Sequence, residues 1–212
     1  MTQQATPDEE PGSPEEMLAA LRAEQANVRR QTVPNTTAMF AAWGVAFVIG
    51  YTALYVGWQP DVGSPAGWSL AILAVAIVAG LVFTGTHLAR RTAGIRGRSN
   101  RVGLMYGSAW FLSFVMAGVI YGSVASLGTP PIAMSVLTNA VGLLIVASLY
   151  MAGAAIWQDW RMFVLGVWFI VVGSIAAIIT PPNGYLVQAI AGGGGFLVAA
   201  LVSVLLVRRQ AS

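Results

Sequence analysis

The charged side chains of this chain all lie outside six long apolar runs, and this separation constrains the fold more than any motif. A helix needs about 20 apolar residues to cross the roughly 30 Å hydrocarbon core of a bilayer. A charge at the centre of a bilayer costs about 2.5 to 3.5 kcal/mol. The sequence therefore predicts an all-α integral membrane protein with six transmembrane helices. The predicted spans are residues 37–58, 66–88, 103–125, 131–156, 162–180 and 184–207.

Composition excludes a soluble domain. The chain is 57% hydrophobic and 9% charged, whereas soluble globular chains carry about 25% charged residues. The six spans leave short loops and an N-terminal segment of about 36 residues, too little for a separate catalytic domain. The expected divisions are a disordered N-terminus at 1–12, a cytoplasmic amphipathic helix at 13–33, a transmembrane domain at 34–209 and a tail at 210–212.

The expected helix at 13–33 has a start signal and an apolar face. Ser13 and Glu16 have the spacing of a capping box, while Met17, Leu18 and Leu21 lie close together on a helix of 3.6 residues per turn. Such a helix has two uses: it rests on lipid headgroups or on the protein's own loops, or it docks a partner.

Arginine placement predicts the orientation. The Arg side chains fall before span 1, between spans 2 and 3, between spans 4 and 5, and after span 6. Basic residues near span ends are retained on the cytoplasmic side, so both termini are expected in the cytoplasm and the connections near Asp61, Thr129 and Pro182 outside.

Arginine without lysine, in a chain rich in Ala, Gly and Val, points to a GC-rich bacterial genome, and hence to a multi-pass protein of the bacterial cytoplasmic (inner) membrane. The arginines are Arg22, Arg29, Arg30, Arg90, Arg91, Arg96, Arg98, Arg101, Arg161, Arg208 and Arg209.

The six spans are expected to form three hairpin repeats. Trp43, Trp110 and Trp168 each precede small and aliphatic residues in the first half of a hairpin. Each outward turn then places a hydroxyl residue before proline, at Ser64-Pro65, Thr129-Pro130 and Thr180-Pro181. We expect each hydroxyl to cap the returning helix. Independent use of the same helix-start chemistry is the alternative to a repeat.

A run of four glycines, Gly192, Gly193, Gly194 and Gly195, lies in the last span. Each glycine weakens a helix by about 1 kcal/mol relative to alanine in water. One interpretation is that a neighbouring helix approaches closely. The other is an unwound segment whose carbonyl groups line a cavity.

Few polar side chains lie within the spans, and two amides among them are candidates for a site. Asn139 and Gln188 each follow an outward Pro pair by about two turns, so they are expected at similar depth, with Thr138 beside Asn139. An amide without a partner in hydrocarbon costs several kcal/mol. These groups therefore either hold helices together or form a site for a neutral solute.

The loop between spans 2 and 3 is expected to contact anionic lipid headgroups, with a partner protein as the less favoured ligand. Its basic residues are Arg90, Arg91, Arg96, Arg98 and Arg101.

The sequence predicts neither catalysis nor a metal site. The chain has no cysteine and one histidine, His87, and its spans contain no acid to complete a catalytic pair or a metal site. No cofactor and no nucleic-acid partner is expected. Two functions remain. The first is a non-enzymatic membrane protein that assembles with itself or a partner through small-residue helix faces and its N-terminal helix; the second is a permease, channel or substrate-capturing transporter subunit for a neutral or hydrophobic solute.

Overall fold

A computed structural model describes residues 13–15, 17–22, 36–92 and 98–209 of the chain. Six of its helical segments are long and apolar enough to cross a membrane, which confirms the predicted all-α multi-pass fold. The predictions for 1–12 and 210–212 lie outside the described residues. The elements are α2 (Thr36–Val56), β1 (Trp58–Gln59), β2 (Ser64–Pro65), α3 (Gly67–Thr92), α4 (Arg98–Ser126), α5 (Pro131–Trp157), α6 (Trp160–Ile179), α7 (Asn183–Val187), the π-helix η1 (Gln188–Gly192) and α8 (Gly193–Arg209).

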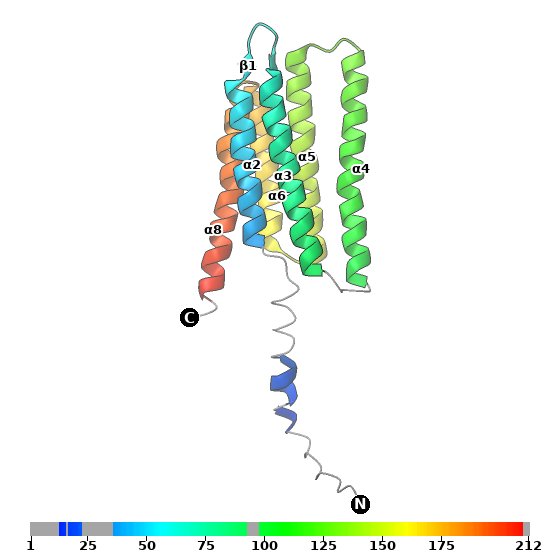
Figure 1. Cartoon of the computed structure of the whole chain (residues 1–212), viewed down its shortest axis with the longest axis vertical. Coiled ribbons are helices and arrows are strands. Elements are labelled where there is room, and N and C mark those ends of the chain that lie inside the picture. The colour runs from blue at the N-terminus through cyan, green and yellow to red at the C-terminus, as the bar shows by residue number, and fades with distance from the viewer. Residues whose placement is uncertain (1–12, 16, 23–35, 93–97, 210–212) are drawn as a thin grey trace, which may run out of the picture.

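The helices stand side by side in one bundle (Figure 1). α5 packs extensively on α6, and α2 packs on both α3 and α8, while α4 packs on α5 at the edge of the bundle. The last span is continuous through α7, η1 and α8. The start of α2 and the end of α8 lie at one end of the bundle, and the short β1–β2 hairpin lies at the other (Figure 1).

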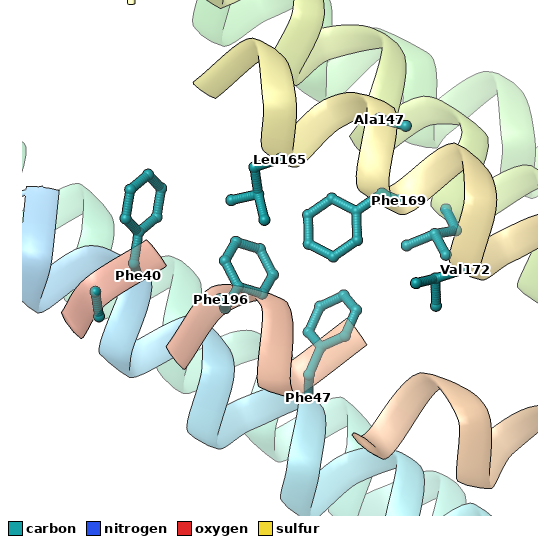
Figure 2. Close-up of a cluster of buried hydrophobic side chains, with 9 residues drawn as sticks. Phe40, Phe47, Ala147, Leu165, Phe169, Val172 and Phe196 are labelled. Atoms are coloured by element: carbon teal, nitrogen blue, oxygen red, sulfur yellow. The ribbon is translucent and has the colours of Figure 1, made fainter. Parts of the chain in front are cut away.

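The core of the bundle is aromatic. Figure 2 shows Phe47 from α2, Phe169 from α6 and Phe196 from α8 meeting one another. The ring centroids of Phe169 and Phe196 are 4.7 Å apart, and those of Phe47 and Phe196 are 5.3 Å apart. Lipid tails are as apolar as these side chains, so close packing rather than escape from water stabilises this cluster.

The three connections that are expected to face outward differ in structure, and the expectation that each hydroxyl caps the returning helix is wrong at the two threonines. Thr129 donates its hydroxyl back to the carbonyl oxygen of Val124 at 2.8 Å, and α5 begins without a side-chain cap. Thr180 instead ends α6, with a φ of 62°, and α7 also begins without a side-chain cap. The hydroxyl of Thr129 and the backbone N–H of Thr180 each bond to a carbonyl oxygen of the helix that is ending.

The first connection, between α2 and α3, is a short two-stranded hairpin. Ser64 pairs with Gln59 in the two-stranded hairpin, and α3 begins three residues later, at Gly67. Ser69, in the first turn of α3, donates its hydroxyl to the carbonyl oxygen of Ala66 at 2.7 Å. The shared hydroxyl-Pro pattern therefore does not correspond to one shared turn, and the three hairpin repeats stay a prediction.

Part of the expected N-terminal helix falls within the described residues. Residues 14–15 and 17–22 are helical, and the backbone N–H of Met17 donates to the carbonyl oxygen of Ser13 at 3.0 Å. Met17, Leu18 and Leu21 are all exposed. The remainder of the predicted helix at 13–33 lies outside the described residues, so its length stays a prediction.

Candidate functional site

Gln188 is the most unusual polar residue of the bundle. Its side chain is fully buried, at 0% exposure, within the last span. Neither its Oε1 nor its Nε2 has a hydrogen-bond partner in the described part of the protein. Buried polar atoms without partners are rare, and each costs about 1 to 3 kcal/mol.

The helix changes its winding at this residue. Gln188 is the first residue of η1, and at the end of η1 the backbone N–H of Gly193 reaches back to the carbonyl oxygens of Gln188 and Ile190. Short π-helical turns inside α-helices are found frequently at functional sites. The segment Gln188–Gly192 contains mostly small residues, which allows the wider turn to fit between neighbouring helices.

The four glycines are helical rather than unwound, and they have different surroundings. Gly192 is the last residue of η1, and the other three open α8. A methyl group on Gly192 would lie 3.3 Å from Phe47, and one on Gly193 would lie 2.6 Å from Val48. The expected close approach is thus present between the last span and α2. Gly194 has no described atom within 4 Å of such a methyl group.

Gly195 contributes to a hydrogen bond that the sequence did not indicate. The indole Nε1 of Trp168, in α6, donates to the carbonyl oxygen of Ala191 in η1 at 2.9 Å. A methyl group on Gly195 would lie 2.5 Å from that same nitrogen. Glycine at 195 therefore leaves the space through which the indole reaches η1.

Thr138 and Asn139 lie in α5, in the first half of the helix. The Thr138 hydroxyl donates to the carbonyl oxygen of Met134 at 2.9 Å within the same helix. Asn139 is partly buried, and it lies on one face of α5 between the buried residues Ser135 and Leu143. Its amide makes no hydrogen bond with that of Gln188, whose two polar atoms are unpartnered.

Asn139 and Gln188 lie in spans that begin at the same end of the bundle. Both segments run in the same direction, because two spans separate their starting points in an alternating bundle. Asn139 is the ninth residue of its span and Gln188 is the sixth, so each amide lies about two turns inside its span.

The arginine loop forms no described site. Arg90 and Arg101 are exposed at the ends of α3 and α4. The side chains of Arg91, Arg96 and Arg98 are not among those the structure describes. The predicted contact of these residues with lipid headgroups or a partner therefore stays a prediction.

The described residues contain no group of three or more His, Cys, Asp or Glu side chains that could hold a metal ion. The ring of His87 stacks on that of Phe83, with centroids 5.7 Å apart. The chemistry that this bundle offers is hydrogen bonding by buried amides and hydroxyls in apolar surroundings. In comparisons with protein-family models, curated proteins and solved structures, no match to this chain was found.

Proposed function

We propose that this chain is a non-enzymatic membrane protein that assembles, with a second copy or with another membrane protein, through one glycine-rich face of α4. The absence of acids and cysteines from all six spans supports a role without catalysis. The glycines of α4 support assembly, and they are the observation that carries the proposal.

Four glycines form the proposed face. They occur as two pairs, Gly103-x-x-x-Gly107 and Gly118-x-x-x-Gly122. Residues four apart are neighbours on a helix, and Gly118 follows Gly107 by about three full turns, so all four lie along one face. In the described part of the chain, no atom lies within 4 Å of a methyl group built on any of them.

Glycines in the centre of the bundle behave differently. A methyl group on Gly44, Gly166 or Gly193 would lie less than 3 Å from an atom of a neighbouring helix. Small residues allow transmembrane helices to approach closely, and pairs of glycines four residues apart form a known helix-association surface. The glycine face of α4 has the same composition and spacing but lacks a neighbour within the described chain.

The position of α4 agrees with this proposal. Only 6% of its apolar stretch is buried inside the bundle, compared with 33% for α2 and for the last span. Its attachment to α5 uses the adjoining face: Tyr106 donates to the carbonyl oxygen of Leu149 at 2.6 Å, and Tyr121 donates to that of Thr138 at 3.1 Å, while no described atom lies within 4 Å of a methyl group built on the four glycines. The glycine face therefore stays open when α4 is attached to the bundle.

The N-terminal segment supplies a second candidate contact. Met17, Leu18 and Leu21 are exposed on its helical part, and an apolar helix face in water gains free energy when a partner or a membrane surface covers it. We propose that this face assists the assembly on the cytoplasmic side of a bacterial inner membrane.

Cysteine cross-linking tests the use of the α4 face. The chain has no cysteine, so any cross-link of the protein must form at the single cysteine that is introduced. Ala125→Cys lies on the glycine face one turn beyond Gly122, whereas Leu112→Cys lies on a different, exposed side of α4. In native membranes we expect oxidation to cross-link two copies of the Ala125→Cys variant. The Leu112→Cys variant should give little cross-linked product. A partner of a different kind would give a heavier adduct with a bifunctional reagent instead.

A bulky substitution tests the close approach. Gly118→Leu should reduce the cross-linked fraction of Ala125→Cys at least fivefold, because the added side chain separates the helices. Gly85→Leu is the matched control, since Gly85 is an exposed glycine of α3 that also has nothing within 4 Å. Equal cross-linking in both variants, with both folded, would refute assembly through the α4 face.

A further inference from the structure

We propose that the acidic N-terminal segment, residues 1–24, docks on its own bundle beside Arg90, at the end of α3. This contact goes beyond the assembly proposed above, because it uses neither the glycine face of α4 nor a partner protein. Glu15 and Arg90 are both exposed, and within the described residues neither side chain forms an ion pair or a hydrogen bond. Both are therefore available for the contact.

The charges of the chain are divided unequally along its length. Residues 1–24 contain six of the eight acidic side chains and one arginine, which gives this segment a formal charge of −5. Residues 25–212 contain the other ten arginines and two acids, which gives a formal charge of +8. The two parts of the chain therefore attract each other. The six acids are Asp8, Glu9, Glu10, Glu15, Glu16 and Glu24.

The two remaining acids do not neutralise Arg90. Asp61 lies in the connection between β1 and β2, at the opposite end of the bundle (Figure 1). Asp159 pairs with Arg161, with 3.3 Å between Oδ1 of the aspartate and Nε of the arginine. The N-terminal segment is thus the main source of negative charge that the chain itself offers to Arg90.

Arg90 lies next to the place where the N-terminal segment enters the bundle. The indole Nε1 of Trp43, in α2, donates to the hydroxyl of Thr84, in the neighbouring antiparallel helix α3, at 3.0 Å. Thr36, at the start of α2, is seven residues from this bond, and Arg90 is six residues from it toward the same end of the bundle. A helix rises 1.5 Å per residue, so both lie about 10 Å from the bond. The entry point and the arginine are therefore at one level on adjacent helices (Figure 1).

The chain is long enough for the contact. Residues 23–35 join the N-terminal helix, which is described at 14–15 and 17–22, to α2. Such a length of chain spans at most about 45 Å, whereas packed helices lie about 8 to 10 Å apart. The tether also keeps the acids at an effective concentration on the order of millimolar. This favours the chain's own bundle over a second copy.

Anionic lipid headgroups also attract arginine, but the N-terminal segment has two advantages over them. A lipid diffuses away, whereas the segment is tethered and brings several acids together. Single exposed ion pairs contribute little, and a group of charges contributes more. Docking would also keep the exposed side chains of Met17, Leu18 and Leu21 near the end of the bundle, where the assembly proposed above can use them.

Pairs of introduced cysteines test the docking in the full-length protein, reconstituted in phosphatidylcholine nanodiscs. Ala19→Cys lies one turn beyond Glu15 on the N-terminal helix, and Ala89→Cys is next to Arg90; both positions are exposed. A short bifunctional maleimide should join this pair within one chain. Ala19→Cys combined with Leu127→Cys, at the opposite end of the bundle, is the matched control and should give no such product. Equal yields from the two pairs, or cross-links only between copies, would overturn the proposal.

Charge reversal distinguishes an ionic contact from an apolar one. Replacing Glu15 and Glu16 with arginine changes the formal charge of the segment from −5 to −1, so the yield of the 19–89 cross-link should fall at least fivefold. Adding Arg90→Glu and Arg91→Glu to that variant should restore most of the yield. An unchanged yield after the first reversal would show that the contact does not depend on charge, and would refute the proposal.

Lipid composition identifies the competing ligand. With the natural charges, the 19–89 cross-link should persist when phosphatidylglycerol, an anionic lipid, is added to the nanodiscs. It should weaken in 0.5 M NaCl, since salt at about this concentration screens exposed charges beyond a few ångströms. Loss of the cross-link on addition of phosphatidylglycerol would assign Arg90 to lipid headgroups and overturn docking of the N-terminal segment.

Discussion

Gly44 and Gly193 face each other where α2 crosses the last span. A methyl group on Gly193 would lie 3.2 Å from the carbonyl oxygen of Gly44, and a methyl group on Gly44 would lie 3.2 Å from the carbonyl oxygen of Gly193. The backbones of the two helices are therefore in mutual contact. Small residues permit this approach, and van der Waals packing in the absence of side chains stabilises it.

Replacement of single glycines in the run 192–195 should separate packing from helix propensity. Gly193→Ala places a methyl group 3.1 Å from the backbone nitrogen of Val48, which cannot move freely, and should lower the free energy of unfolding by about 1 to 3 kcal/mol. Gly194→Ala meets no described atom and should raise stability by up to about 1 kcal/mol. Titration with SDS in mixed micelles measures both. Equal destabilisation by the two variants would contradict this assignment.

The hydrogen bond from Trp168 to η1 should be coupled to Gly195. Trp168→Leu loses the bond to the carbonyl oxygen of Ala191 and should cost about 0.5 to 1.5 kcal/mol. Gly195→Ala should also destabilise, because its methyl group meets the indole. In the double variant, the smaller leucine should relieve that clash. The combined loss measured by SDS titration should therefore be smaller than the sum, and strict additivity would show that the two residues do not interact.

The attachment of α4 to α5 should depend on two tyrosine hydroxyls. Tyr106→Phe removes the 2.6 Å bond to Leu149, and Tyr121→Phe removes the 3.1 Å bond to Thr138. Each variant should lower the free energy of unfolding by about 0.5 to 1.5 kcal/mol. The two residues are about four turns apart on α4, so their effects should add in the double variant. No change in either variant would mean that α4 is held by other contacts.

The spans could be predicted from the sequence because lipid imposes a simple rule on them. A run of apolar residues long enough to cross a bilayer has to be helical, and the predicted boundaries lie within a few residues of the observed ones. The connections between the spans follow no such rule. A hydroxyl residue before proline can bond to the helix that ends or to the helix that begins. Thr129 bonds to the ending helix through its hydroxyl, and Thr180 does so through its backbone N–H.

The candidate site was predictable only in part. Gln188 was recognisable as a polar residue in an apolar span, but its complete burial depends on the rotation of the helix, which the tertiary packing sets. The sequence likewise gave no means of distinguishing Gly194, which is open, from Gly193, which is packed. The indole of Trp168 in the middle of an apolar span was a usable signal for an interhelical hydrogen bond, since an indole N–H in hydrocarbon requires an acceptor.

The arginine asymmetry predicts that the β1–β2 end of the bundle faces away from the cytoplasm. Leu127 lies between α4 and α5 and is 82% exposed. The Leu127→Cys variant should then react with a membrane-impermeant maleimide in intact bacterial cells or spheroplasts. Gln158→Cys, in the exposed residue between α5 and α6, should react only after lysis. The two positions lie at opposite ends of α5, so each is a control for the other. Labelling of Gln158→Cys but not of Leu127→Cys in intact cells would mean that the orientation is the reverse of the predicted one. The arginines, including Arg161 near Gln158, would then lie outside the cell. This would contradict the general bias that retains basic residues in the cytoplasm.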